Sequence, residues 1–174
     1  MKVTKNQEAP AFNVEDIYGK SLHIPFKGKK TLLCFMRFAG CPVCNLRVHE
    51  LLKNAAGLEA ANIHVVLVYE SDKRVMLDYL MEEKFPFSFI SDKEHKLYTL
   101  YSIEKSFGKF FSGMLKGTLS KVFAGKKLYK HAVSPDGSVS RINADFLIDE
   151  KGIVSIAHYG SYFGDELSVE KMLV

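Results

Sequence analysis

One stretch, residues 29–50, constrains the fold of this chain more than any other. The segment KKTLLCFMRF is a continuous apolar run of strand length, which is typical of a strand buried on both faces of a sheet. Cys41 and Cys44 follow it directly, with a proline and a valine between them. The apolar spacing in NLRVHELLKNAAGL then predicts a helix that ends at Gly57. A buried strand that delivers a cysteine pair to the start of a helix indicates an α/β protein with its chemistry at that junction.

Hairpins are predicted near both ends of the chain. Within APAFNVEDIYGKSLHIPF, two short extended segments flank a turn at residues 18–20, which predicts an N-terminal β-hairpin. Toward the C-terminus, DFLIDEKGIVSIAHYG predicts a strand, a turn and a second strand, and GDELSVEKML predicts a short final helix. Because antiparallel pairs accompany an alternation of strands and helices, we expect a mixed central sheet rather than a purely parallel one.

Strands and helices alternate between these two hairpins. ANIHVVLVYES predicts a second buried strand and FSFI a short third one. The helix in SDKRVMLDYLMEEKF is expected to be capped by Ser71 or Asp72 and closed by Pro86. Ser91 and Glu94 have the spacing of a capping box, which predicts that the next helix starts at Ser91.

Composition and length bound the class of protein. The 174 residues suit a single domain spanning residues 1–174. A formal charge of +4 is too weak a basic balance to imply a nucleic-acid partner, and no apolar run approaches the roughly 18 residues of a membrane span. The N-terminal MKVTKNQEAPAF has no hydrophobic signal core, so we expect a cytoplasmic protein. In a reducing cytosol, a close cysteine pair indicates redox or metal chemistry.

The segment of about residues 105–140 differs from the rest of the chain. It carries seven lysines against one acidic residue, Asp136, and its large apolar residues fall at helical spacing. Gly108, Gly113 and Gly117 favour two short helices over one long helix. The simplest interpretation is an amphipathic insertion that packs on the sheet with a solvated lysine face. A lid over the cysteines, a docking surface for an acidic partner and a membrane-surface helix are the alternatives. SPDGS at residues 134–138 predicts an exposed turn.

The start of a helix favours the thiolate form of a cysteine. If the helix begins near Cys41, Pro42 occupies its first position, where a missing N–H costs nothing. Both Cys41 and Cys44 then lie near unpaired backbone N–H groups and the positive end of the helix dipole. One thiolate could attack a substrate and the other could resolve the product into a small disulfide ring. Cys34, inside the buried strand, is expected to be an inert core thiol.

A metal site is the main alternative use of the pair. Cys41, Cys44 and His49 begin a zinc-like spacing, but the next ligand would fall on Asn54 and the chain has no second CxxC. Asn45 at the following position excludes haem attachment through CxxCH. We therefore expect neither a metal nor a cofactor, and we interpret His49 as an ordinary helix residue.

Three segments in this order resemble the landmark segments of peroxiredoxins of the alkyl hydroperoxide reductase and thiol-specific antioxidant superfamily. They are APAFNVEDIYGKSLHI, PFSFISDKEHKLYTLYSI and ADFLIDEKGIV. FMRFAGCPVC, together with AHYGSYFGDELSVEKML, resembles the CxxC-containing branch of that superfamily. The likeness spans nearly the whole chain outside residues 105–140. It implies a thioredoxin-like three-layer sandwich with a mixed central sheet, an N-terminal β-hairpin extension and a helical insertion.

The resemblance also implies roles for site residues. When the peroxiredoxin pattern Pro-x-x-x-Thr-x-x-Cys is laid on this sequence, the reactive cysteine falls on Cys44. Cys41 then replaces the threonine, and Arg37 replaces the proline. In thioredoxin-like enzymes the first cysteine, Cys41, attacks instead, so the order of attack stays open. Arg37 and Arg141 are the candidates for a cation that polarises the peroxide. Asn143 stands where thioredoxin folds carry a cis-proline.

Three classes of function follow. The resemblance implies a thiol-dependent peroxidase that reduces hydroperoxides through a Cys41/Cys44 dithiol–disulfide cycle. The replaced proline and threonine favour an alternative, a thioredoxin-like dithiol–disulfide oxidoreductase that acts on protein disulfides with little peroxidase activity. A second alternative is a non-enzymatic scaffold or binding module. We expect a hydroperoxide or protein-disulfide substrate and a thiol electron donor such as a thioredoxin-type protein, with a homodimer as an open alternative for the oligomeric state.

Overall fold

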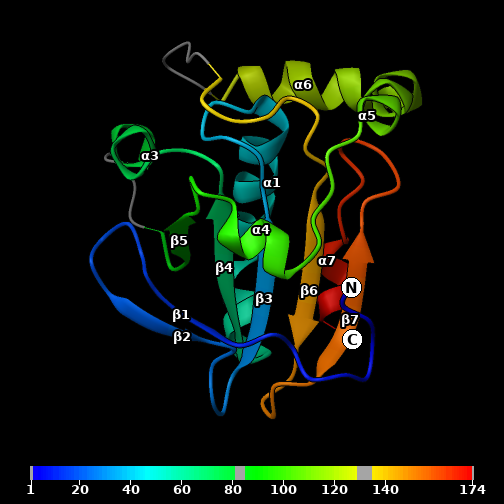
Figure 1. Cartoon of the computed structure of the whole chain (residues 1–174). Coiled ribbons are helices and arrows are strands. Elements are labelled where there is room, and N and C mark those ends of the chain that lie inside the picture. The colour runs from blue at the N-terminus through cyan, green and yellow to red at the C-terminus, as the bar shows by residue number, and fades with distance from the viewer. Residues whose placement is uncertain (1, 81–84, 129–134, 174) are drawn as a thin grey trace.

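The computed structural model describes residues 2–80, 85–128 and 135–173 (Figure 1). Its strands alternate with helices, as the apolar pattern predicts. The strands are β1 (Phe12–Glu15), β2 (Ser21–Ile24), β3 (Lys30–Phe35), β4 (Ile63–Tyr69), β5 (Ser88–Ser91), β6 (Ala144–Ile148) and β7 (Val154–Tyr159). The helices are α1 (Pro42–Lys53), α2 (Ala55–Ala60), α3 (Lys73–Leu80), α4 (Lys96–Leu100), α5 (Phe107–Gly113), the π-helical η1 (Met114–Thr118), α6 (Leu119–Lys126) and α7 (Val169–Met172).

Five of these strands form one mixed sheet in the order β5-β4-β3-β6-β7. β3 pairs in parallel with β4, β4 pairs in parallel with β5, and the β3/β6 and β6/β7 pairs are antiparallel. β1 and β2 form a separate antiparallel hairpin. The predicted mixed sheet, N-terminal hairpin and thioredoxin-like α/β architecture are therefore confirmed.

The central strand β3 is buried on both faces, as its apolar run predicts. Leu32 and Cys34 point into one core together with α1, and Leu33 and Phe35 point into a second core together with α4; all four are fully buried. In Figure 1, α4 crosses in front of the sheet and α1 runs behind it. Each such buried Leu or Phe side chain stabilises the fold by about 1.5–3 kcal/mol. The two cores fix β3, and with it the loop that carries the cysteine pair.

The predicted single helix after the cysteines is two helices. α1 ends at Lys53 and α2 begins at Ala55, so Gly57 lies inside α2 and does not end a helix. Asn54 forms the junction, because its side-chain amide and its backbone N–H both donate to the carbonyl of Glu50. An asparagine that competes for the backbone carbonyls in this way interrupts the regular helical pattern.

The capping box predicted at Ser91 is wrong, and Asp92 performs the capping instead. Its carboxylate accepts the backbone N–H groups of the first three residues of α4, at 2.7–3.1 Å. Ser91 donates its hydroxyl to the carbonyl of Ser71, and Glu94 pairs with Lys96. Ser91 is therefore held by a neighbouring loop and is not available to the helix start.

Asp72 caps α3 by accepting the backbone N–H of Arg74 at 2.9 Å, which agrees with one of the two predicted caps. The predicted closure of this helix before Pro86 falls partly on residues 81–84, which lie outside the described ranges.

The basic insertion forms α5, η1 and α6, which lie together at the top of the molecule in Figure 1. Gly117, with a φ of 92°, interrupts the helical geometry between α5 and α6, which agrees with the prediction of two short helices. The predicted exposed lysine face is incomplete, because large apolar side chains are exposed on these helices as well. Within the described ranges, no helix has the length and apolar character needed to cross a membrane.

The turn predicted at residues 134–138 is less exposed than expected where the structure describes it. The Asp136 carboxylate accepts hydrogen bonds from the Ser71 hydroxyl, at 2.6 Å, and from the backbone N–H of Asp72. An added Cβ on Gly137 would lie 2.9 Å from the Glu70 carboxylate. This turn is therefore packed against the end of β4, near the cysteine loop.

We predict that Gly125→Ala destabilises the protein by about 1–3 kcal/mol, because a Cβ there would overlap the Pro42 carbonyl and push α6 away from α1. Gly108→Ala is the matched control, because its added Cβ would come only to 4.0 Å of the Ser106 hydroxyl. That control should be neutral or stabilising by up to about 1 kcal/mol. Urea unfolding followed by circular dichroism measures both, and equal effects would contradict the proposed contact.

Candidate active site

The cysteine pair lies at the start of α1, where the sequence places it. Cys41 is the N-cap residue, with an extended backbone (φ −73°, ψ 116°), and Pro42 occupies the first helical position. The φ of proline is already suited to a helix start, so this residue fixes the point at which the backbone turns. Cys44 lies in the first turn. The two sulfurs are thereby held near the unpaired N–H groups of the helix N-terminus.

Both thiols are fully buried. The sequence around the pair could not show this, because the covering elements come from distant parts of the chain. α6 packs on α1, where Gly125 meets the Pro42 carbonyl, and Phe163 belongs to the same buried cluster as the cysteines. The pair therefore lies in a site from which most water is excluded.

Arg37 is the cation nearest to the pair. Its Nη1 lies 3.7 Å from the sulfur of Cys41, and its side chain is almost completely buried. Its Nε donates to the carbonyl of Ser138 at 3.4 Å, and its Nη2 donates to the carbonyl of Val139. The guanidinium also lies over the ring of Phe163, 4.1 Å from the centroid. A positive charge is thus fixed against one sulfur in a region of low dielectric.

This environment decides which cysteine carries the negative charge. Burial by itself would raise the pKa of the Cys41 thiol. The hydrogen bond from the Cys44 thiol, the charge of Arg37 and the backbone N–H groups of Cys44 and Val43 outweigh burial and lower that pKa to about 6. At neutral pH, Cys41 is therefore the thiolate.

The other two thiols stay protonated. Burial raises the pKa of Cys44 well above its ordinary value, and the hydrogen bond and charge of Cys41 raise it further. Burial likewise raises the pKa of Cys34, and Asp145 on the neighbouring strand adds to the effect. Cys44 is a protonated partner beside a thiolate, and Cys34 is a buried core thiol, as the sequence predicts.

The structure does not bring Arg141 to the sulfurs. Its Nε and Nη2 both bind Glu70, at 2.7 and 2.6 Å, and its Nη1 donates to the carbonyl of Ile103. Its guanidinium stacks over Tyr98, 4.5 Å from the ring centroid. Every guanidinium nitrogen of Arg141 thus has a partner away from Cys41 and Cys44.

Glu70 is a site residue that the sequence reasoning missed. It is fully buried, and its second carboxylate oxygen accepts the backbone N–H of Ser138 at 2.6 Å. The carbonyl of Ser138 in turn accepts Nε of Arg37. Arg141 and Glu70 therefore hold the loop that positions Arg37. A charged residue directly after the apolar strand β4 was the only signal of this role in the sequence.

Two further candidates are placed by the structure. Asn143 is 2% exposed, and neither its amide nitrogen nor its amide oxygen has a hydrogen-bond partner among the residues described. His49 lies half-buried on α1. Across residues 2–80, 85–128 and 135–173, no three His, Cys, Asp or Glu side chains are grouped so that they could hold a metal ion.

Sequence comparison supports what this geometry indicates. Residues 6–157 match the model of the AhpC/TSA family, a span that includes the cysteine pair, Arg37 and Glu70. The chain belongs to the AhpC/TSA family. By sequence, no curated protein matches it.

Solved structures with the same fold include peroxiredoxins and a disulfide-exchange protein. Peroxidoxin BcpB from Mycobacterium tuberculosis superposes with a TM-score of 0.69 at 13% identity, covering 98% of this chain and 94% of that one. The reduced 2-Cys peroxiredoxin from Plasmodium vivax gives 0.68 at 17% identity, with 98% and 79% coverage. A candidate thiol:disulfide interchange protein, DsbE from Chlorobium tepidum, gives 0.61 at 17% identity, with 90% and 86% coverage.

The family and the fold together support a thiol-dependent oxidoreductase of the peroxiredoxin-like kind. In this AhpC/TSA protein, the surroundings favour reaction at Cys41, with Cys44 beside it, because the pKa of Cys41 is lowered whereas burial raises that of Cys34.

We predict that Arg37→Met raises the pKa of Cys41 from about 6 toward the free-cysteine value of about 8.5. The change removes the positive charge beside the sulfur, while the methionine still fills the aromatic surroundings. Thiolate absorbance near 240 nm, followed against pH, measures the midpoint. Arg74→Met, at an exposed position on α3, is the matched control and should leave the midpoint in place. A midpoint that stays near 6 in Arg37→Met would contradict the role of Arg37.

Proposed function

We propose that this AhpC/TSA protein is a peroxidase that reduces hydroperoxides through a Cys41/Cys44 dithiol–disulfide cycle, in which Cys41 attacks. One observation carries the proposal: the Cys41 sulfur is buried, faces Arg37 at 3.7 Å and is hydrogen-bonded by the protonated Cys44. A nucleophile, a fixed positive charge and a resolving thiol are thus in contact before any substrate arrives.

The first step of the cycle forms a sulfenic acid. The Cys41 thiolate attacks one peroxide oxygen, the O–O bond breaks, and the second oxygen leaves as an alkoxide or hydroxide that takes up a proton. Negative charge moves from sulfur to the leaving oxygen during this step. Arg37 lies where its charge can stabilise both the sulfur and the leaving oxygen. Because two backbone carbonyls hold its guanidinium in place, Arg37 does not need to reorganise during the step.

The second step forms the disulfide. The sulfur of Cys44 attacks the sulfur of the Cys41 sulfenic acid, the S–O bond breaks, and the hydroxyl leaves as water with the proton of the Cys44 thiol. A thiol electron donor, such as a thioredoxin-type dithiol protein, would then reduce the disulfide and itself be oxidised. A reducing cytoplasm would supply such a donor, and we propose that compartment for the cycle. The homodimer stays a prediction, which sedimentation velocity can test.

Burial of the sulfurs favours a small substrate. A protein disulfide must bring its own sulfur into line with the attacking thiolate, which requires an accessible thiolate. Cys41 has no exposed surface beneath its cover of α6 and Phe163, whereas a hydroperoxide needs only a narrow opening. This difference favours peroxide over protein disulfides in the oxidising step, and the cover must open when the thiol donor reduces the disulfide.

The dithiol–disulfide oxidoreductase is the second candidate, and one observation favours it. The attacker supported by the electrostatics is the first cysteine of the CxxC, which is the thioredoxin order, and Cys41 occupies the place of the threonine in the peroxiredoxin pattern. A non-enzymatic scaffold ranks last, because a thiol pKa lowered by a dedicated buried cation is typical of reactive sites.

We predict that hydrogen peroxide converts the wild type to an intramolecular Cys41–Cys44 disulfide, faster by at least tenfold than it oxidises free cysteine. In Cys44→Ser, oxidation should stop at a sulfenic acid that a dimedone-type probe traps on Cys41. In Cys41→Ser, no trapping is expected, because burial, the largest cause of the raised Cys44 pKa, remains in that variant. Cys34→Ala is the matched control and should react like the wild type. Stopped-flow kinetics and peptide mass spectrometry give both readouts.

Each other outcome has a defined meaning. Trapping only in Cys41→Ser would make Cys44 the attacker and overturn the assignment of roles. A wild type that reacts no faster than free cysteine, without trapping in either variant, would exclude the peroxidase. Reduction of insulin disulfides by that same protein would then establish the dithiol oxidoreductase.

A further inference from the structure

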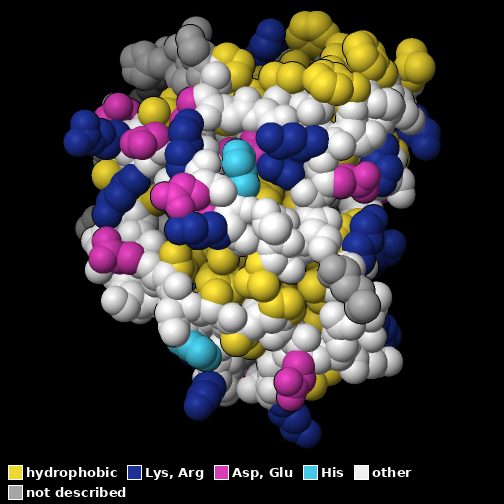
Figure 2. Space-filling model, in the orientation of Figure 1, with side chains coloured by type: hydrophobic (Ala, Val, Ile, Leu, Met, Phe, Trp, Pro, Cys, Tyr) yellow, Lys and Arg dark blue, Asp and Glu magenta, His cyan; other side chains and the backbone are white. Residues whose placement is uncertain are grey.

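A row of large apolar side chains is exposed on the insertion, away from the cysteine site. These residues recur every four positions along α5, η1 and α6, and their exposed fractions are 64%, 63%, 90%, 46% and 63%. We call this row the apolar ridge; it consists of Phe107, Phe111, Leu115, Leu119 and Phe123. Figure 2 shows hydrophobic side chains gathered along the top of the molecule, over these helices. A continuous exposed row of this kind marks an interaction surface rather than scattered surface residues.

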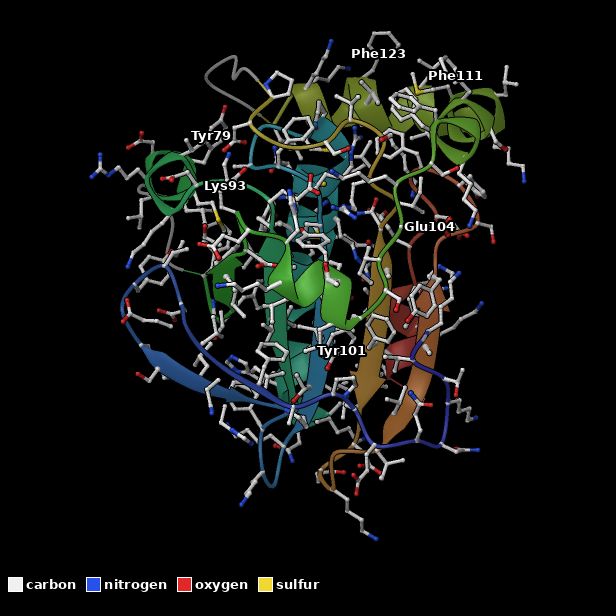
Figure 3. All side chains as sticks on the ribbon, viewed as in Figure 1. Tyr79, Lys93, Tyr101, Glu104, Phe111 and Phe123 are labelled. Atoms are coloured by element: carbon white, nitrogen blue, oxygen red, sulfur yellow. The ribbon has the colours of Figure 1, made fainter. Side chains whose placement is uncertain are left out.

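The inner side of the same helices is already used by the fold. Phe110, Met114 and Val122 pack against the buried cluster beneath them, and Gly113 lies against the backbone of Phe163. Figure 3 shows Phe111 and Phe123 projecting from the other side, away from the sheet and from α1. The ridge is therefore not part of the core, and the described chain leaves it facing outward.

The charge around the ridge has a single sign. Residues 105–128 contain six lysines and no acidic residue. Lys109 and Lys121 point toward the body of the protein, where they pair with Glu104 and Glu166. The other four are exposed: Lys105, Lys116, Lys126 and Lys127. One of them, Lys116, has its ammonium 4.7 Å from the ring centroid of Tyr162. An occupant of this surface should therefore offer apolar material bordered by negative charge.

We propose that α5, η1 and α6 form a peripheral membrane-binding surface that lies on anionic lipid. The ridge would enter the boundary between headgroups and acyl chains, and the four exposed lysines would meet the negative headgroups. A helical segment with Phe and Leu on one side and lysine at its margins has the composition of such interfacial segments. The segment is amphipathic and lies along the surface of the molecule, which suits a position in the plane of the interface.

A second copy of the chain is a poor occupant. A twofold contact through the ridge would place the same basic surface on both sides, and eight exposed lysines, four from each copy, would face one another without acidic partners from these helices.

A protein reductant is also a poor occupant. The ridge points away from α1, so a partner seated on it would have α6 between its own thiols and Cys41. A lipid surface needs no access to the sulfurs, and it accepts a protruding row of side chains without a matching groove.

The chain has no tryptophan, so one introduced residue gives a unique optical reporter. Phe123→Trp places it on the ridge, and Tyr18→Trp, at an exposed position in the β1–β2 turn, is the matched control. Vesicles of phosphatidylcholine with 30% phosphatidylglycerol should shift the emission of Phe123→Trp to the blue and leave Tyr18→Trp unchanged. Raising the salt from 0.05 to 0.5 M should weaken binding by at least fivefold, because salt screens the attraction between the lysines and the anionic headgroups.

Co-sedimentation with the same vesicles separates the apolar and charge contributions. Leu115→Asp should weaken binding by at least tenfold, and Leu100→Asp, an exposed change on α4, should leave it as in the wild type. Lys116→Glu, Lys126→Glu and Lys127→Glu together should abolish binding. The control with the same net charge, Lys27→Glu, Lys29→Glu and Lys151→Glu, lies at the other end of the molecule and should retain it. Peroxide reduction in solution should be equal in the wild type and Leu115→Asp.

Three results would overturn the proposal. The first is a wild type that neither sediments with the anionic vesicles at 0.05 M salt nor shows the tryptophan shift. The second is ridge-dependent binding to polyglutamate without binding to vesicles, which would assign the surface to an acidic protein. The third is concentration-dependent dimerisation that Leu115→Asp abolishes, which would make the ridge a contact between copies of this chain.

Discussion

The contact between the Arg37 guanidinium and the Cys41 sulfur is the interaction on which this site depends. Burial opposes a thiolate, and a buried cysteine without compensation would stay protonated and inert. The hydrogen bond from the thiol of Cys44, the fixed charge of Arg37 and the N-terminal N–H groups of α1 reverse that tendency and bring the Cys41 pKa to about 6.

That contact is supported by residues that never touch the sulfur. Arg37 is held by the carbonyls of Ser138 and Val139, and the backbone of Ser138 is held by Glu70. Arg141 neutralises Glu70 inside the protein, so the loop is tied to a fully paired buried carboxylate. Removing one member of a buried pair leaves an uncompensated charge, which costs more than the pair itself contributes. The site is therefore built from a second layer of charges as well as from the cysteine pair.

Much of the fold could be predicted because strands that are buried on both faces give continuous apolar runs in the sequence. β3 and β4 leave continuous apolar runs, and the proline between the two cysteines marks the start of α1. For the same reason, the position of Cys41 and Cys44 at the start of α1 could be predicted from the sequence. Hydrogen bonds between side chains and nearby backbone groups were harder to predict. Asn54 separates two helices because its side chain binds the carbonyl of Glu50, and Asp92 rather than Ser91 caps α4 because its carboxylate accepts the first N–H groups of that helix.

The parts that could not be predicted depend on contacts between distant segments. Glu70 and Arg141 are 71 positions apart, and neither residue alone indicates a buried pair. The burial of the sulfurs depends on α6, which arrives from the insertion after β5. The helical spacing of the insertion was visible in the sequence. How α5 and α6 pack on the rest of the protein decides which of their apolar residues are exposed, and the sequence alone does not show this packing.

The most direct test of this account is a pH titration of protein labelled with ¹³C at the cysteine Cβ atoms, followed by NMR. The Cβ shift reports the charge of each thiol separately, so the three cysteines are read in one experiment. We expect Cys41 to titrate near pH 6, while Cys44 and Cys34 stay protonated to well above their ordinary range. If Cys44 titrates before Cys41, or if both titrate near the free-cysteine value of about 8.5, Arg37 and Cys44 do not make Cys41 the thiolate and the account is wrong.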